Sequence, residues 1–96
     1  MKKYKYKVKY TSIYKKNLKK LIKQGKDIDK LLDVVDILAT TKVLDNKYYN
    51  HKLFDNKKYK NCYECHIEPD WLLIYQYYDV NLILMLVNTG SHSNIL

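Results

Sequence analysis

The three histidines and one nearby carboxylate are the residues best suited to acid-base chemistry. Each histidine lies where a strand is expected to begin or end: His51 opens one strand, His66 closes another, and His92 follows the last. Imidazole titrates at about pH 6.5, so such a cluster supplies a base and an acid at neutral pH without a metal. Asp70 joins them. A lone histidine is more often structural than catalytic, and no H-x-x-x-H or similar spacing indicates a metal site.

The only proline of the chain connects His66 to Asp70. Pro69 fixes its own φ and cannot donate a hydrogen bond to a sheet, so residues 68–71 predict a tight connection between two adjacent antiparallel strands. That connection would hold His66 and Asp70 close together at one end of a sheet.

A second motif, Cys62-Tyr63-Glu64-Cys65-His66, matches the C-x-x-C-H pattern of c-type haem attachment. Covalent haem belongs to exported proteins, and the lysine-rich start lacks the apolar core of a signal peptide. Within a strand the two cysteines would also point to opposite faces, which disfavours one zinc ion. We therefore expect Cys65 to be a small core residue and Cys62 an incidental surface thiol. An exported haem protein stays a minor alternative.

The net charge of +8 comes from lysine alone, because all eighteen basic residues are lysine. Lysine neutralises phosphate as a point charge but cannot make the planar bidentate contacts that read guanine edges. A nucleic-acid partner would therefore be held by its backbone. Biased codon usage and a solvated surface are the alternative explanation of the lysine count. The excess over ten acidic residues nevertheless favours a polyanionic partner.

The chain length and hydropathy predict one domain spanning residues 1–96. With 47% hydrophobic residues, a chain of 96 residues forms one core, burying roughly 60–70% of its unfolded surface. Its longest apolar run is too short to span a bilayer. Two cysteines three residues apart do not form a disulfide framework. We expect a cytoplasmic protein with no membrane association.

Two helices are expected after an N-terminal strand. Residues 3–10 alternate tyrosine or valine with lysine, which predicts a half-buried strand. Thr11 or Ser12 can cap a first helix that Gly25 ends, and Asp27 can cap a second helix that runs to about Thr40. Apolar stripes on both helices, including Ile22 and Leu32, predict a helical hairpin that covers something flat.

The second half of the chain supplies the sheet. Strands are predicted at residues 51–54, 60–67, 72–78 and 82–87, with residues 89–92 as a flexible turn after the last one. This order predicts an α+β fold in which a two-helix hairpin packs on one face of a mostly antiparallel sheet of four to five strands.

Three stretches carry a resemblance to a known family. They are His51-Lys52-Leu53, Cys65-His66-Ile67-Glu68-Pro69-Asp70-Trp71-Leu72-Leu73-Ile74-Tyr75 and Thr89-Gly90-Ser91-His92-Ser93-Asn94. In this order, and after a strand and a helical hairpin, they resemble the signatures of YafQ-type toxins in the RelE/ParE superfamily. The resemblance covers essentially the whole chain and implies a RelE-like fold.

The same resemblance implies a function. It implies a bacterial type II toxin that enters the ribosomal A site and cleaves mRNA. From the residues themselves we expect no cofactor and no metal. The resemblance also implies a cognate antitoxin, of the ribbon-helix-helix type, that silences the toxin. The catalytic cluster would consist of His51, His66, Asp70 and His92.

The chain departs from the family pattern at three positions. Family members usually carry arginine at the position of Asn88 and near Tyr63, and phenylalanine at the position of Leu96. A missing arginine removes a fixed positive charge that would stabilise the pentacoordinate phosphate. The candidates to compensate and to bind RNA are Lys52, Lys57, Lys58 and Lys60.

These observations predict a ribosome-dependent mRNA endoribonuclease. His92 is expected to be the acid, Asp70 or His66 the base that takes a proton from a ribose 2′-OH, and His51 a residue that orients or stabilises charge. The alternative is a catalytically weakened module of the same fold, which only binds an antitoxin or acts on DNA gyrase as the ParE branch does. Retention of all three histidines and Asp70 favours the enzyme.

Overall fold

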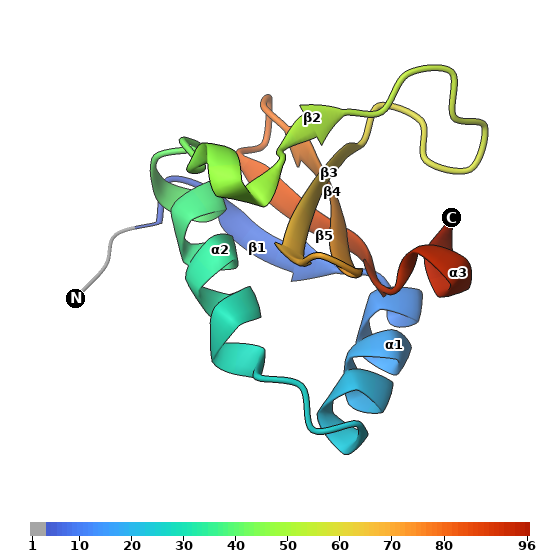
Figure 1. Ribbon diagram of the computed structural model, residues 1–96. Coiled ribbons are helices and arrows are strands. Elements are labelled where there is room, and N and C mark those ends of the chain that lie inside the picture. The colour runs from blue at the N-terminus through green and yellow to red at the C-terminus, as the bar shows by residue number, and fades with distance from the viewer. Residues whose placement is uncertain (1–3) are drawn as a thin grey trace.

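The computed structural model describes residues 4–96, and the first residue of the expected strand 3–10 lies outside this range. In chain order the elements are β1 (Lys7–Tyr10), α1 (Ser12–Lys23), α2 (Ile28–Thr40), the 3-10 turn η1 (Asn46–Tyr48), β2 (His51–Lys52), β3 (Tyr63–Glu68), β4 (Trp71–Tyr78), β5 (Ile83–Gly90) and α3 (His92–Ile95) (Figure 1). Among these helices none is long and apolar enough to cross a membrane.

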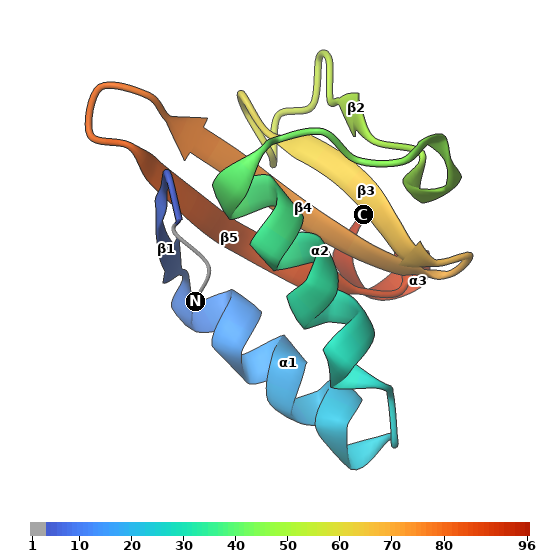
Figure 2. The same cartoon turned by 90° about the vertical axis from the view of Figure 1, so that its left-hand side faces the viewer.

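The five strands form one sheet in the order β1-β5-β4-β3-β2. β1 runs parallel to β5, and the other neighbouring strands are antiparallel. α1 packs against β5 and α2 against β3, both on the same face of the sheet (Figure 2). The predicted α+β fold, with two helices on one face of a mostly antiparallel sheet, is therefore confirmed.

The helix ends follow from local sequence. The Thr11 hydroxyl accepts a hydrogen bond from the backbone N–H of Tyr14 at 3.0 Å and so caps α1. Gly25 ends α1 with φ +80°, a conformation that favours glycine. The Asp27 carboxylate accepts from the backbone N–H of Asp29 at 3.1 Å and caps α2. All three predicted signals are confirmed.

Apolar side chains are buried on both faces of the central strand β4. Trp71, Leu73 and Tyr75 belong to the core beneath the helices, whereas Leu72 and Ile74 point to the other face. There they meet the rest of a smaller cluster, formed by Tyr59, Cys62 and Ile95. The loop of residues 53–62 and the terminal helix α3 therefore cover part of the face that lacks α1 and α2.

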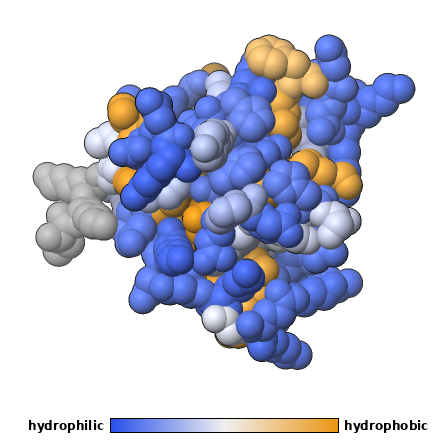
Figure 3. Space-filling view, viewed as in Figure 1, coloured by the Kyte–Doolittle hydropathy of each residue, from blue (hydrophilic) through white to orange (hydrophobic). Residues whose placement is uncertain are grey.

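The apolar helix stripes are narrower than the sequence predicts. Leu32 and Ile22 are both about half exposed, at 51% and 54%, although we expected them to face inward. Leu32 follows the buried Leu31, and Ile22 follows the buried Leu21. One residue turns a helix by about 100°, so the next side chain points away from the sheet. The face seen in Figure 3 is mostly hydrophilic with scattered apolar areas.

The expectation that Cys62 is a surface thiol is wrong. Cys62 is buried in the cluster with Tyr59, because the chain from residue 53 to 62 folds back over the sheet and β3 begins only at Tyr63. The cysteines do lie on opposite faces, since Cys65 belongs to the core beneath the helices. Burial raises the pKa of both thiols, that of Cys65 to about 12, so both are poor metal ligands and nucleophiles.

The boundaries of the predicted strands also shift. β2 ends at Lys52, and Phe54, which we placed in this strand, is exposed in the loop that follows. Asp55 and Asn61 take positive φ in this loop, a conformation in which Asp and Asn are enriched. The chain therefore turns twice before β3, which shortens both predicted strands.

Candidate active site

Glu64 and His66 point from β3 to the face of the sheet opposite α1 and α2. Cys65 between them faces the helices, and side chains alternate along a strand. The Glu64 side chain is only 6% exposed, and its Oε1 lies 3.2 Å from His66 Nε2. That distance allows a hydrogen bond, or an ion pair when the ring is protonated. His66 thus has one ring nitrogen held by a buried carboxylate.

His92 and Asp70 form a second pair beside the first. Asp70 lies in the tight turn between β3 and β4, as predicted, and its Oδ1 is 2.8 Å from His92 Nδ1. The same oxygen accepts the backbone N–H of His92 at 3.1 Å. These hydrogen bonds lower the pKa of Asp70, so the carboxyl group stays ionised. The rings of His66 and His92 are 5.5 Å apart between centroids.

His51 lies on the other side of Glu64. β2 pairs with β3 so that His51 is opposite Glu64, and His51 Nε2 is 4.0 Å from Glu64 Oε2. His51 Nδ1 donates to the carbonyl oxygen of Tyr49 at 2.8 Å, which fixes the orientation of the ring. The four sequence-predicted residues are therefore brought together, with Glu64 between two of the histidines.

Glu64 is the member of this cluster that sequence analysis missed. It stands two residues before His66 on a strand, so the alternation of side chains places both on one face. The Cys-x-x-Cys-His pattern overlapped the same stretch and drew attention to the cysteines instead. One ligand atom each of Glu64, His66 and His92 also lies within 4.8 Å of the others, close enough to hold a single metal ion.

The C-terminal segment that carries His92 is a fixed helix. We expected residues 89–92 to form a flexible turn, but β5 continues to Gly90 and α3 begins at His92. The Tyr59 hydroxyl donates to the carbonyl oxygen of Ile95 at 2.5 Å, and the Ile95 side chain is fully buried. Contacts distant in sequence therefore fix α3, which is why local sequence did not predict it.

Three of the four lysines predicted to bind RNA lie together. Lys52, Lys57 and Lys60 line a shallow hollow of about 490 Å³ next to β2. Lys58 instead donates to the carbonyl oxygen of Ile95 at 3.2 Å and helps to hold α3. The hollow thus gathers three lysines next to β2, whereas Lys58 contacts the helix that bears His92.

Neither departure from the arginine pattern adds charge to the cluster. The Asn88 amide is buried, donates to the Tyr59 hydroxyl at 2.9 Å and accepts from Asn17 at 2.6 Å. Tyr63 stacks on Tyr75 with centroids 5.6 Å apart beneath the helices. Positive charge near the histidines must therefore come from lysine or from protonated histidine.

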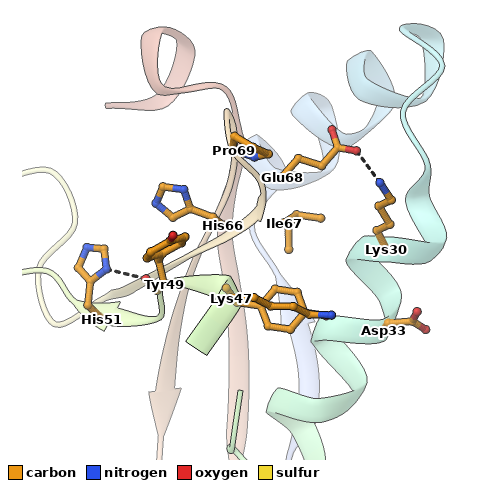
Figure 4. Close-up of a pocket in the computed structure, with 10 residues that line it drawn as sticks. Lys30, Asp33, Lys47, Tyr49, His51, His66, Ile67, Glu68 and Pro69 are labelled. Atoms are coloured by element: carbon orange, nitrogen blue, oxygen red, sulfur yellow. Dashed lines mark hydrogen bonds and ion pairs between the residues drawn. The ribbon is translucent and has the colours of Figure 1, made fainter. Parts of the chain in front are cut away.

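A larger hollow of about 800 Å³ opens beside the cluster. His51, Tyr49 and His66 lie along one side, and α2 lies opposite them (Figure 4). Lys30 donates to Glu68 at 3.0 Å at its upper end. The histidine cluster is therefore accessible from a cleft rather than enclosed.

Comparison with known proteins identifies the family of this chain. The family described as the bacterial toxin of the type II toxin-antitoxin system, YafQ, matches residues 6–96. A curated relative, the mRNA interferase toxin YafQ of Escherichia coli strain K12, is 33% identical over 87 residues, which are 90% of each chain.

Solved structures share the whole fold. The crystal structure of a metal-bound toxin from Helicobacter pylori superposes with a TM-score of 0.88 at 38% identity, covering 95% of this chain and 99% of that chain. The E. coli DinJ-YafQ toxin-antitoxin complex gives a TM-score of 0.84 at 30% identity, covering 96% of this chain and 98% of that chain. Sequence and fold together show that this chain belongs to the YafQ family of bacterial toxins of type II toxin-antitoxin systems.

Proposed function

We propose that this protein is an mRNA endoribonuclease that cleaves RNA by attack of a ribose 2′-OH. The observation that carries the proposal is the adjacency of two carboxylate-held histidines, His66 with Glu64 and His92 with Asp70, whose rings are 5.5 Å apart. Such a pair can remove one proton and supply another in the same step. The curated relatives of the chain are named mRNA interferase toxins, which supports the same reaction.

His66 is the better candidate for the base. Its Nε2 faces Glu64, so we assign the proton there and leave the lone pair of Nδ1 to take the 2′-OH proton. Asp70 was the alternative base, but its two hydrogen bonds from His92 and its lowered pKa make it a weak proton acceptor. Glu64 then orients His66 and stabilises the imidazolium that forms.

His92 is the candidate acid. Asp70 holds its Nδ1, so a proton on Nε2 can pass to the departing 5′ oxygen. The 2′ oxygen forms a bond to phosphorus as the bond from phosphorus to the 5′ oxygen breaks. The products are a 2′,3′-cyclic phosphate and a 5′-hydroxyl, and exchange of protons with solvent restores both histidines. His51 contributes by orienting Glu64 from its other side.

Lysine supplies the positive charge that the phosphate backbone needs. We propose that Lys52, Lys57 and Lys60, which share one hollow next to β2, bind the RNA backbone. Lys58 has a structural contact with α3 and is the weaker candidate. The net charge of +8 also supports binding within the ribosome, where RNA phosphate surrounds the substrate.

We propose that a cognate antitoxin covers this face of the protein. The solved complex of the E. coli relative is a toxin-antitoxin complex, and an acidic segment would offset the charge of +8. Burial of His51, His66 or His92 by the partner would exclude RNA. A complex with these three histidines open and undisturbed would contradict this expectation.

Mapped cleavage products test the activity and its rival together. Purified toxin is added to ribosomes translating a defined mRNA, and the cuts are located by primer extension. We expect cuts within the translated region that end in a 2′,3′-cyclic phosphate, with none from the His66→Gln variant. A supercoiling assay with DNA gyrase runs in parallel. Intact mRNA together with inhibited gyrase would favour the rival binding module of the same fold.

A further inference from the structure

The larger hollow has a wall that the proposed chemistry does not use. Its volume of about 800 Å³ lies within the roughly 300–1,000 Å³ of small-molecule sites. The residues that line the hollow and matter here are Lys30, Lys47, Tyr49, His51, His66 and Glu68. Because His66 and His51 belong both to this wall and to the catalytic cluster, a nucleotide beside the reacting phosphate would reach the hollow first.

Tyr49 presents an exposed ring on this wall. Tyr49 is 69% exposed, and its ring contacts the His66 ring edge to face, with centroids 5.6 Å apart. Figure 4 shows the ring beside His66, between the histidines and the hollow. An exposed aromatic ring next to a proton-transfer site offers a flat apolar surface that nothing else in the described chain covers completely.

The backbone of Tyr49 is fixed although its ring is exposed. Its φ of +47° is uncommon for an aromatic residue, and its N–H donates to the carbonyl oxygen of Asn46 at 3.0 Å. Its own carbonyl accepts from His51 Nδ1 at 2.8 Å. The position of the ring is therefore tied to the position of the histidines, as a binding surface that orders a substrate requires.

The hollow also offers charge suited to a nucleotide. Lys47 extends along its lower side toward α2, with Nζ 5.1 Å from the centre of the Tyr48 ring (Figure 4). Of the two acids that line the hollow, Glu68 is matched by Lys26 and Lys30 at 3.3 Å and 3.0 Å, and Asp33 lies on the α2 side, across the hollow from Tyr49 (Figure 4). A single aromatic platform with a nearby lysine is a common arrangement for one unpaired base and its phosphate.

We propose that the hollow is a subsite for one RNA base, that of the nucleotide flanking the cleaved phosphate, which stacks on Tyr49 while Lys47 contacts its backbone. The proposal rests on the proposed ribonuclease function, since it places this base next to His66. Stacking accepts every base because each has a flat π face. The subsite therefore positions the RNA for cleavage without selecting a sequence.

Binding of a non-cleavable RNA to the full chain tests the subsite. The probe is a short oligonucleotide with 2′-O-methyl riboses, titrated to millimolar concentration and followed by NMR shifts of the aromatic rings and by anisotropy. We expect shifts at Tyr49 and His66. Tyr49→Ala should weaken binding about five- to hundredfold, the contribution of one stacked base, and Tyr49→Phe should bind as wild type does. Tyr10→Ala, an exposed tyrosine on the opposite edge strand β1, is the matched control.

The outcomes separate the subsite from the chemistry. Binding that depends on Tyr49, found together with an absence of cleavage products in the ribosome assay, would support the subsite and count against the proposed reaction. Cleavage that occurs normally in Tyr49→Ala, with unchanged oligonucleotide affinity, would overturn the subsite alone. The absence of shifts at Tyr49, or equal weakening by Tyr10→Ala, would also overturn it.

Discussion

Replacing His92 with alanine should remove most mRNA cleavage and leave the fold nearly intact. The His92 side chain is 47% exposed, and its main polar contact is the one from Nδ1 to Asp70. The backbone N–H of the same residue also donates to Asp70, at 3.1 Å, and alanine keeps this bond. The tether of α3 through Tyr59 and Ile95 does not involve the imidazole.

The two effects differ enough in size to be separated. An exposed ion pair contributes about 0–1 kcal/mol to stability. In a domain of this size that loss lowers the melting temperature by at most about 8 °C. Loss of a positioned proton donor lowers the rate about 10²- to 10⁴-fold, which corresponds to about 2.7–5.4 kcal/mol of transition-state stabilisation.

A melting curve and a ribosome-dependent cleavage assay, run side by side, decide whether His92 is the general acid or a structural residue. Ser93→Ala, in the same helical turn and equally remote from the core, is the matched control. Wild-type cleavage by His92→Ala at an unchanged melting temperature would refute the acid role. Lost cleavage with a collapsed melting temperature would instead make His92 a structural residue.

Four further predictions follow from the same contacts. Asp70→Asn removes the anion that faces the His92 imidazolium, so the alkaline limb of the pH-rate profile should move to lower pH. Because the folded pKa of Asp70 is lowered, its contact with His92 stabilises the fold above about pH 3.9, and this stabilisation is lost as the pH falls through the folded pKa. Melting curves of wild type and Asp70→Asn in acid would show the loss in wild type alone. Tyr59→Phe removes the hydrogen bond to α3 and the one from the buried Asn88 amide, and because it leaves buried groups unpaired it should cost about 1–3 kcal/mol in urea unfolding, with kcat reduced more than KM changes. Gly90→Ala should lower cleavage and stability more than Gly25→Ala, because its added Cβ would lie 2.9 Å from an α3 methyl group, whereas that at Gly25 has nothing within 4 Å. RNA binding should weaken with salt, with a slope of about −0.7 per phosphate neutralised on a single strand; a flat response between low and physiological salt would contradict backbone binding by lysine.

Local sequence signals predicted the parts of the site that local structure determines. Pro69 indicated the tight turn, and this turn places Asp70 near His66 because only a few residues separate them. The alternation along β3 places Glu64 on the same face as His66, a signal that was present in the sequence but was overlooked. Short-range rules of turn and strand geometry are thus sufficient for this half of the cluster.

The other half depends on contacts between residues far apart in the chain. The position of His92 follows from Tyr59 and Ile95, which are 36 residues apart and meet on the far face of the sheet. The larger hollow next to the histidines forms only because the chain after α2 places η1 beside β3. Sequence periodicity carries no information on either approach, because neither repeats with the period of a helix or strand.

Asn88 has a neutral amide, so the positive charge that would stabilise the phosphate during cleavage must come from other residues. The resemblance leads us to expect arginine at this position, but the Asn88 side chain is buried and joins Tyr59 to Asn17, so it supports the tether of α3 and carries no charge. A pentacoordinate phosphate beside His66 would then be stabilised by the His92 imidazolium and by mobile lysines, which lack the fixed fork of a guanidinium. Histidine loses its proton near neutral pH, whereas arginine stays charged throughout that range. Cleavage by this chain should therefore depend more steeply on pH than cleavage by a relative with an arginine there, and pH-rate profiles of the two proteins, recorded side by side, would measure the difference.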